Sequence, residues 1–238
     1  MGDFLFKYRG QIPILLFLLV IPFIWKTDYS SFSNKTIVTN NIISIIISFF
    51  GLLIRFYTVG KTPGGTSGRN RSKQIAKKIN TKGIYSITRN PLYFGNYLIW
   101  LGISIFSLNT FFTILLSFFF FFYYGKIIKT EEKFLFKKFG NSFIEWKERT
   151  PGFFPSFKKY KSDKYSLSIK TILKREYSSL LATIFSFFYI STLINLKLNS
   201  NNLIDRKWLT ILVITITVTI ILRAIKRNTN LLNQKGRT

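Results

Sequence analysis

Long apolar runs separated by charged loops dominate the chain. Uncharged stretches cover residues 10–25, 36–54, 90–125, 177–196 and 208–222. A membrane helix needs about 20 residues, so the third stretch predicts two helices joined by a turn at Ser107-Leu108-Asn109-Thr110. The pattern predicts an all-α integral membrane protein with about six transmembrane helices.

Two of these runs need a further argument. Residues 208–222 alternate Thr with Ile and Val, which is also typical of a strand. An isolated strand cannot satisfy its backbone in lipid, so we expect a helix there. No small-residue cleavage site follows the first run, which favours an uncleaved first helix over a signal peptide.

Basic residues are concentrated in some of the loops. The chain has 35 Lys and Arg against 9 Asp and Glu, a net charge of +26. Residues 1–11, 60–90, 126–176 and 223–238 hold 29 of these basic residues, whereas 26–41 and 197–207 hold 5. The positive-inside rule therefore predicts that both termini lie in the cytoplasm, at the inner or cytoplasmic membrane. Such segregation favours a membrane protein that faces anionic lipid headgroups over a nucleic-acid-binding protein.

The chain contains no Cys and no His. This composition excludes disulfides, thiol nucleophiles, imidazole bases and the usual zinc sites. We therefore predict no metal site.

The segment 60-GKTPGGTSGRN-70 is rich in Gly and polar residues. A phosphate-binding P-loop needs Gly five residues before the Gly of GKT, but position 55 is Arg. Two interpretations remain. The segment is a flexible loop leaving a membrane helix, or a lid that brings backbone N–H groups and Arg69 to an anion.

The segment 87-ITRNPLYFGNY-97 marks the start of the third apolar run. Pro91 suits the first turn of a helix, and Asn90 suits its N-cap. A helix start with a snorkelling arginine would account for these residues alone. It would not require Tyr93, whose hydroxyl we expect to face a polar cavity, or Gly95, which allows a helix or a ligand to come close.

Glu131-Glu132 follows the fourth predicted membrane helix in a chain with few acids. Two adjacent carboxylates beside lipid are costly unless something cationic uses them. The simpler alternative is a solvated helix end paired with nearby lysines.

The sequence after this pair predicts a cytoplasmic amphipathic helical segment. Residues 134–139 carry an apolar stripe, and Gly140 suits a helix C-cap. Ser142 and Glu145 fit a capping box that begins a second short helix, which Pro151 ends. We expect this segment to lie on the membrane and to cover a cofactor from the cytoplasmic side.

In this order, the motifs resemble the isoprenylcysteine carboxyl methyltransferase and phospholipid methyltransferase superfamily. Its hallmark is G-x-Y-x-x-x-R-H-P-x-Y-x-G, then an apolar hairpin, E-E, F-G-x-x-Y/F-x-x-Y/W and a proline. The matching residues are Gly83-Ile84-Tyr85, Arg89-Asn90-Pro91-Leu92-Tyr93-Phe94-Gly95, Glu131-Glu132, Phe139-Gly140, Phe143, Trp146 and Pro155. The resemblance covers about residues 50–157, and the ordered set is specific although a bare R-x-P is not.

The resemblance implies an integral membrane enzyme that binds S-adenosylmethionine in a pocket on the cytoplasmic side. The cofactor-binding residues that it implies are Arg89, Tyr93, Gly95, Glu131 and Glu132. The catalytic residues that we assign with it are Arg89, Asn90 and Glu132. The substrate residues that we assign are Arg55, Arg69 and Tyr85.

Asn90 departs from the family pattern, which has His at this position. Asn donates and accepts hydrogen bonds, but it is not a base at neutral pH. An amine acceptor must lose a proton, whereas a carboxylate or phosphate oxygen is already anionic. We therefore predict methylation of an anionic lipid oxygen. A resemblance of residues 66–97 to lipid A 1-phosphate methyltransferase-type members points to a lipid phosphate.

Other functions stay open at this point. They are phospholipid N-methylation, isoprenylcysteine carboxyl methylation, a reductase related to sterol reductases, and a non-catalytic basic membrane scaffold. We expect residues 1–41 to form an N-terminal helix and outer loop, 42–160 the methyltransferase core with its cofactor pocket, and 161–238 a C-terminal membrane hairpin and tail. The sequence makes no prediction of the oligomeric state.

Overall fold

The computed structural model describes residues 4–5, 8, 12–66 and 76–237. This described part is all-helical, as predicted, with seven α-helices and three short 3-10 helices. The α-helices are α2 (Ile12–Lys26), α3 (Asn34–Lys61), α4 (Pro91–Phe106), α5 (Thr110–Phe139), α6 (Asn141–Arg149), α7 (Ile169–Lys197) and α8 (Arg206–Asn228). The 3-10 helices are η1 (Tyr29–Ser31), η2 (Gly83–Ser86) and η3 (Phe157–Lys159).

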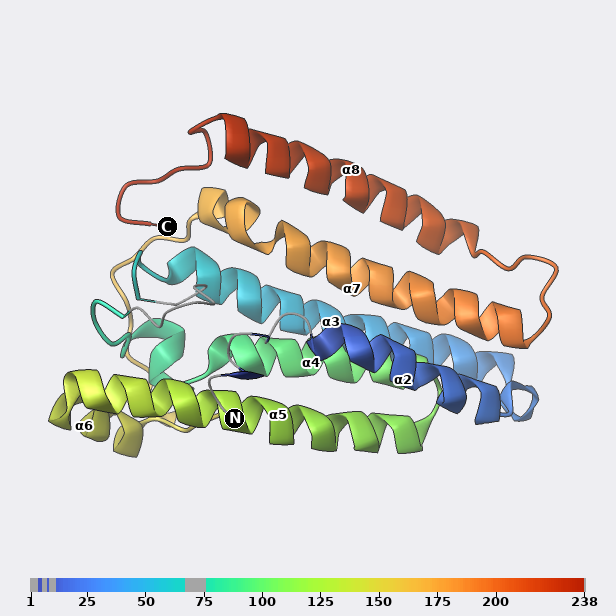
Figure 1. Cartoon of the computed structure of the whole chain (residues 1–238), viewed down its shortest axis with the longest axis horizontal. Helices are drawn as coiled ribbons and strands as arrows, with labels where there is room; N and C mark the ends of the chain where they lie inside the picture. The colour runs from blue at the N-terminus through green and yellow to red at the C-terminus, as the bar shows by residue number, and fades with distance from the viewer. Residues whose placement is uncertain (1–3, 6–7, 9–11, 67–75, 238) are drawn as a thin grey trace.

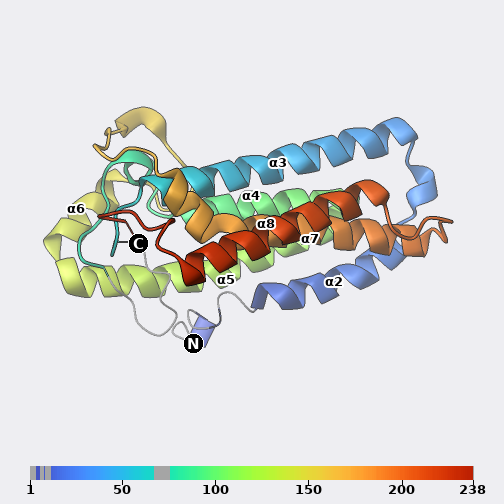
Figure 2. The same cartoon turned by 90° about the horizontal axis from the view of Figure 1, so that it is seen from above.

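The apolar helices form one elongated bundle. Helices α2, α3, α4, α5, α7 and α8 run along a common direction, each antiparallel to the one before it, and α6 lies at one end (Figures 1 and 2). The most extensive contacts join α3 with α4, α7 with α8, and α3 with α7. The helix predicted for residues 208–222 is confirmed as the central part of α8.

Four helices of the described part are long and apolar enough to cross a membrane: α3, α5, α7 and α8. Large apolar side chains face outward from them, among them Phe118 and Ile220, which are 65% and 62% exposed. These features support an integral membrane protein. The predicted number of six spanning helices is not confirmed. At about 1.5 Å per residue, α2 with 15 residues and α4 with 16 are shorter than the apolar core of a bilayer.

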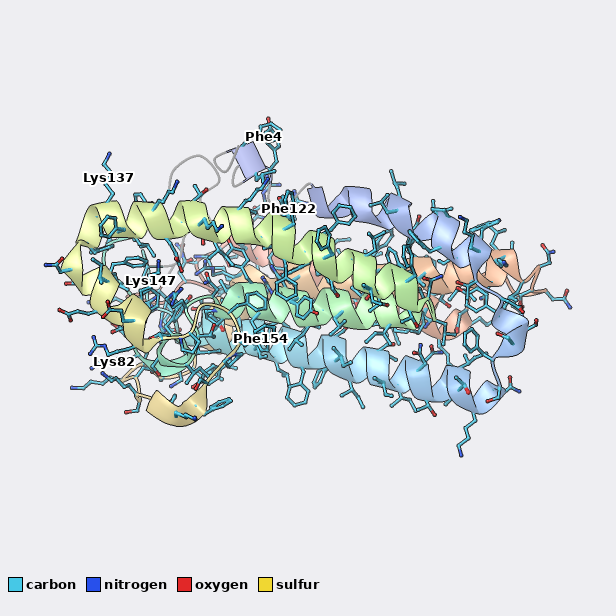
Figure 3. All side chains as sticks on the ribbon, turned by 90° about the horizontal axis from the view of Figure 1, so that it is seen from below. Phe4, Lys82, Phe122, Lys137, Lys147 and Phe154 are labelled. Atoms are coloured by element: carbon cyan, nitrogen blue, oxygen red, sulfur yellow. The ribbon has the colours of Figure 1, made fainter. Side chains whose placement is uncertain are left out.

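The bundle gathers the most basic loops at one end. Residues 61–66, 76–90, 140–168 and 229–237 meet there, and we call it the basic end. The backbone N–H of Gly64 donates to the carbonyl of Gly236, and that of Gly83 donates to Lys161. Figure 3 shows Lys82, Lys137 and Lys147 at this end. The grouping agrees with the predicted loop sides, while the side of the membrane that the basic end faces stays a prediction.

The turn between α4 and α5 lies where the sequence predicts it, at the opposite end. The side chain of Asn109 caps α5 by accepting the N–H of Phe112 at 2.7 Å. The carbonyl of Ser107 accepts a hydrogen bond of 2.9 Å from the buried hydroxyl of Tyr29. Burial raises the pKa of Tyr29 to about 12, so this phenol stays protonated as a donor.

Helices α5 and α6 are separated by a single residue, Gly140, so the connection between them is shorter than predicted. Helix α5 continues to Phe139 and ends at Gly140, which has a φ of 51° and is the C-cap that the sequence predicts. The capping box predicted at Ser142 and Glu145 is wrong, because α6 begins at Asn141. An N-cap needs non-helical backbone, and here Gly140 alone makes the break, so Ser142 is already helical.

Helices α3 and α4 approach each other at small residues. A methyl group added to Gly95 would lie 2.8 Å from the carbonyl oxygen of Gly51. One added to Gly102 would overlap the hydroxyl of Ser48 and the carbonyl of Ser44. In lipid, helices associate largely through such close van der Waals contact, so these glycines set the separation of the two central helices.

We predict that Gly102→Ala destabilises the bundle by about 1–3 kcal/mol, because the new methyl group forces α3 and α4 apart. The measurement is thermal unfolding of the purified protein in detergent. Gly125→Ala is the matched control, since nothing lies within 4 Å of its added methyl group. This control should be neutral or stabilising by a few tenths of a kcal/mol. Equal effects of the two substitutions would contradict the close contact.

Candidate functional site

The acidic pair on α5 meets the start of α4 at the basic end. The hydroxyl of Tyr93, on the first turn of α4, donates to Glu131 Oε1 at 2.9 Å. Arg89, two residues before α4, donates from Nε to Glu132 Oε1 at 3.0 Å, and its Nη2 lies 2.9 Å from the same oxygen. The antiparallel helices thus bring together motifs in which Arg89 and Glu132 are 43 residues apart.

Arg89 also holds the segment that follows α6. Its Nη1 donates to the carbonyl oxygens of Lys147 and Thr150 at 2.9 and 2.6 Å. Its backbone N–H donates to the carbonyl of Pro151 at 2.9 Å. The side chains of Arg89 and Glu132 are 13% and 18% exposed. A guanidinium has five N–H groups, so these bonds leave one N–H on Nη2 for a ligand.

Asn90 occupies the N-cap position of α4, as predicted, but its side chain does not cap the helix. Its Nδ2 instead donates to the carbonyl of Gly152 at 2.7 Å. The neighbouring hydroxyl of Thr88 donates to the carbonyl of Phe153 at 2.8 Å. Asn90 therefore helps to fix the backbone that closes over the start of α4.

Helix α6 is the amphipathic helix expected after Gly140. Phe143 and Trp146 on its inner face are 2% and 6% exposed. The indole Nε1 of Trp146 donates to the carbonyl of Tyr85 at 3.0 Å. The helix thereby packs on the segment before α4, while its role as a cover for a cofactor stays a prediction.

Tyr85 lies in η2, within electrostatic range of both α5 and α7. Burial raises the pKa of its phenol, and the negative charge of Glu131 raises it further. Hydrogen bonds with Thr62 and Asn80 and the positive charge of Arg175 act in the opposite direction. The phenol is therefore neutral at pH 7 and links the acidic pair to the loop after α3.

Arg55, assigned as a substrate residue, is instead bound inside the bundle. Its Nε and Nη2 donate to Glu176 at 2.9 and 3.1 Å, its Nη2 to Ser179 Oγ at 3.0 Å, and its Nη1 to Asn96 Oδ1. The side chains of Arg55 and Glu176 are 11% and 1% exposed. These bonds commit Arg55 to joining α3 and α7. Glu176 was not predicted as a functional residue, although it lies at the edge of an apolar run, as the acidic pair on α5 does.

Two assigned residues remain. Gly95 faces α3, where it lies close to the backbone of Gly51. Arg69 lies outside the described residues.

The polar groups of the site are suited to binding an organic cation. It offers two half-buried carboxylates, a phenol and one free guanidinium N–H, and carboxylates stabilise a neighbouring positive charge. In the described part of the chain, no group of three or more His, Cys, Asp or Glu could hold a metal ion.

Comparison with known proteins gives matches over the part of the chain that holds these motifs. Residues 40–142 match the model of the family described as phospholipid methyltransferase. Over 97 residues the chain is 37% identical to the cobalt-zinc-cadmium resistance protein CzcN of Cupriavidus metallidurans, covering 41% of this chain and 42% of that protein. Over 95 residues it is 30% identical to the protein-S-isoprenylcysteine O-methyltransferase of Schizosaccharomyces pombe, covering 37% and 40%. No solved structure gives a significant match.

The matched segment contains most of α3 and all of α4 and α5, including both motifs of the site. The predicted superfamily resemblance is therefore confirmed for residues 40–142. The match spans about two fifths of the length of each of these relatives, and α7 and α8 lie outside the family match.

We predict that Arg89→Lys loosens the segment after α6, because an ammonium group cannot reproduce the bonds of the guanidinium to Glu132 and two carbonyl oxygens. Charge-assisted hydrogen bonds contribute about 1.5–3 kcal/mol each, so amide exchange over residues 150–156 should rise about tenfold or more. Hydrogen exchange by mass spectrometry measures this. Arg149→Lys, in an exposed pair with Glu145, is the control and should leave the exchange unchanged. Unchanged exchange in both variants would show that Arg89 does not hold this segment.

We predict that Arg55→Met destabilises the protein by about 3–5 kcal/mol, because it removes the guanidinium that pairs with the buried carboxylate of Glu176. The double variant Arg55→Met/Glu176→Leu should recover most of this loss, since it removes both charges. Thermal unfolding in detergent compares the two variants. Removing the exposed pair Glu145 and Arg149 in the same way should cost less than about 0.5 kcal/mol. A double variant no more stable than the single one would disprove the pairing.

Proposed function

We propose, from the membership of residues 40–142 in the phospholipid methyltransferase superfamily, that this chain is a membrane-embedded S-adenosylmethionine-dependent methyltransferase. Its acceptor on this proposal is an anionic lipid oxygen, such as a lipid phosphate like that of lipid A. The observation that carries the proposal is the pairing of two motif residues with two adjacent carboxylates, Tyr93 with Glu131 and Arg89 with Glu132.

The two carboxylates would hold the cofactor. S-adenosylmethionine supplies an electrophilic methyl group on a positively charged sulfur and carries an ammonium and a carboxylate group. Glu131 and Glu132 are suited to its two positive centres, and the remaining N–H of Arg89 is suited to its carboxylate. Because Arg89 makes several other bonds, we propose that it mainly orients Glu132 and the segment over α4. Preorganised charges of this kind lower a transition state without having to reorganise.

Asn90 supports an acceptor that carries no proton. Its side chain is already used as a donor to Gly152, and an amide is no base. The chain has no His or Cys to take a proton from an amine. A phosphate or carboxylate oxygen needs no base, because its lone pair is free to attack at pH 7.

The surroundings of the site support a lipid as the acceptor. The site joins the first turn of α4 to α5 at the basic end of a bundle with many exposed apolar side chains, where an amphipathic molecule would place its headgroup. Positive charge at this end favours anionic headgroups and supports our placing of the basic end, with both termini, in the cytoplasm. Aminolipid nitrogen and prenylcysteine carboxylate are the alternative acceptors within the superfamily.

The test is methyl transfer by the purified protein in lipid nanodiscs that contain phosphatidic acid, phosphatidylethanolamine and phosphatidylcholine. With labelled S-adenosylmethionine, we expect label in a methyl ester of the lipid phosphate. Label confined to aminolipid headgroups would contradict the anionic acceptor. Absence of both label and S-adenosylhomocysteine binding would favour a non-catalytic scaffold.

We predict that Glu131→Gln lowers the rate of this transfer about 100-fold or more, because it removes a charge aimed at the cationic centre. Glu145→Gln is the matched control, since its side chain is 70% exposed on α6, and it should keep the rate of the unmodified protein. Initial rates at saturating lipid measure both. If Glu131→Gln transferred methyl groups at a rate close to that of the control, the proposed role of Glu131 would be contradicted.

A further inference from the structure

A cleft of about 340 Å³ opens at the basic end. Its walls come from three parts of the chain: the end of α3, the segment 78–85 and the segment 163–165. Four lysines line it, and the only acid among its lining residues is Asp163. The lining lysines are Lys61, Lys78, Lys82 and Lys164.

The positive charge of this cleft exceeds what its own acid can balance. Lys61 Nζ lies 3.3 Å from Asp163 Oδ1 and donates to the carbonyl of Tyr165 at 2.6 Å. Lys78 Nζ donates to the hydroxyl of Tyr165 at 2.9 Å. Among the described residues, no carboxylate lies within 4.0 Å of the ammonium groups of Lys78, Lys82 or Lys164. Three cations therefore share one hollow with no counter-charge of their own.

The C-terminal segment adds a second and independent sign of a missing anion. Its Arg237 donates from Nη2 to the carbonyl of Ser166 at 2.7 Å, and the guanidinium lies 5.1 Å from the ring centre of Tyr165, a lining residue of the cleft. Its Nη1 is buried and has no hydrogen-bond partner within the described chain. A buried donor without an acceptor is costly, so this group is suited to an anion that enters beside Tyr165.

Tyr85 connects the cleft with the segment before α4. It lines the cleft together with Thr62 and Asn80, and its backbone carbonyl accepts from the indole of Trp146 on α6. The negative charge of Glu131 also contributes to the raised pKa of Tyr85. The segment that carries Tyr85 continues to Arg89 and α4, so a headgroup in the cleft would lie at the same end of the bundle as the proposed cofactor residues.

We propose that this cleft binds the phosphate group of an anionic lipid. Phosphate is the group that several ammonium donors around a small hollow recognise, because its oxygens accept from many directions at once. The lipid source follows from the place of the cleft at the end of α3, a helix with an apolar, exposed surface along its length. The inference rests on the proposed function in one respect, since the bound lipid would be the methyl acceptor.

The test compares two triple variants that remove the same charge from the same end of the protein. Lys78→Gln/Lys82→Gln/Lys164→Gln empties the cleft of its unpaired cations. Lys133→Gln/Lys137→Gln/Lys138→Gln is the control, because these lysines are exposed on the last turns of α5 outside the cleft. Each protein, in neutral detergent without cofactor, is titrated with dioctanoyl phosphatidic acid, dioctanoyl phosphatidylcholine and inorganic phosphate, with binding followed by native mass spectrometry.

We expect the unmodified protein to bind phosphatidic acid more tightly than phosphatidylcholine. The cleft variant lacks three of the four lysines that line the cleft, so it should lose about tenfold or more of this affinity. The control variant should stay within about threefold. Equal losses in the two variants would mean diffuse attraction by the basic end and would overturn the site. Inorganic phosphate that binds as tightly as phosphatidic acid would overturn the lipid source and assign a soluble phosphate compound.

Methyl transfer separates this inference from the proposed function. If phosphatidic acid binds through the cleft while no label reaches any lipid, the proposed function fails and the binding site stands. If label reaches lipid phosphate at the same rate in the cleft variant and the control variant, the function stands and the cleft is not the acceptor site.

Discussion

A carboxylate buried beside lipid must be paired or hydrogen-bonded, and the basic end of this protein is held together by four such groups. Glu131 accepts from Tyr93, Glu132 from Arg89, Glu176 from Arg55, and Asp163 from Lys61. Each bond joins two parts of the chain that are far apart in sequence. Since an unpaired buried charge costs several kcal/mol, each acid selects one arrangement of the helices that it joins.

Arg89 connects Glu132 with the segment that follows α6. A flexible side chain could pair with Glu132 alone, but the planar guanidinium also reaches the carbonyl oxygens of Lys147 and Thr150. Asn90 and Thr88 add bonds to the same returning segment at Gly152 and Phe153. The start of α4, the acidic pair and the cover over them are therefore ordered together. In this arrangement, the side chain at position 90 is used as a hydrogen-bond donor to the carbonyl of Gly152.

The C-terminal hairpin, α7 and α8, is outside the segment that matches the family, yet it is tied to it. The buried pair of Arg55 and Glu176 links α7 to α3, and the tail after α8 returns to the loop after α3 through Gly64 and Gly236. This places Arg175 near the phenol of Tyr85. The hairpin thus contributes charge and shape to the surroundings of the site, in addition to apolar surface.

The sequence by itself determined the features that depend on local pattern. The apolar runs placed the helices, Ser107 to Asn109 placed the turn of the central hairpin, Gly140 placed the end of α5, and the ordered motifs identified the superfamily. The resemblance assigned residues 89–93 and the acidic pair to one pocket, and the antiparallel helices α4 and α5 bring these residues into contact.

Only the tertiary structure decided which way individual side chains point and what they contact. Gly95 faces α3, and Arg55 forms an ion pair with Glu176. Ser142 lies within α6, which was expected to begin after it. The cleft is built from segments that are up to about 100 residues apart in the sequence, so no local sequence pattern predicts it. Helical periodicity says which residues share a face, but the neighbour on that face is chosen by packing and by the need to pair buried charges across the whole chain.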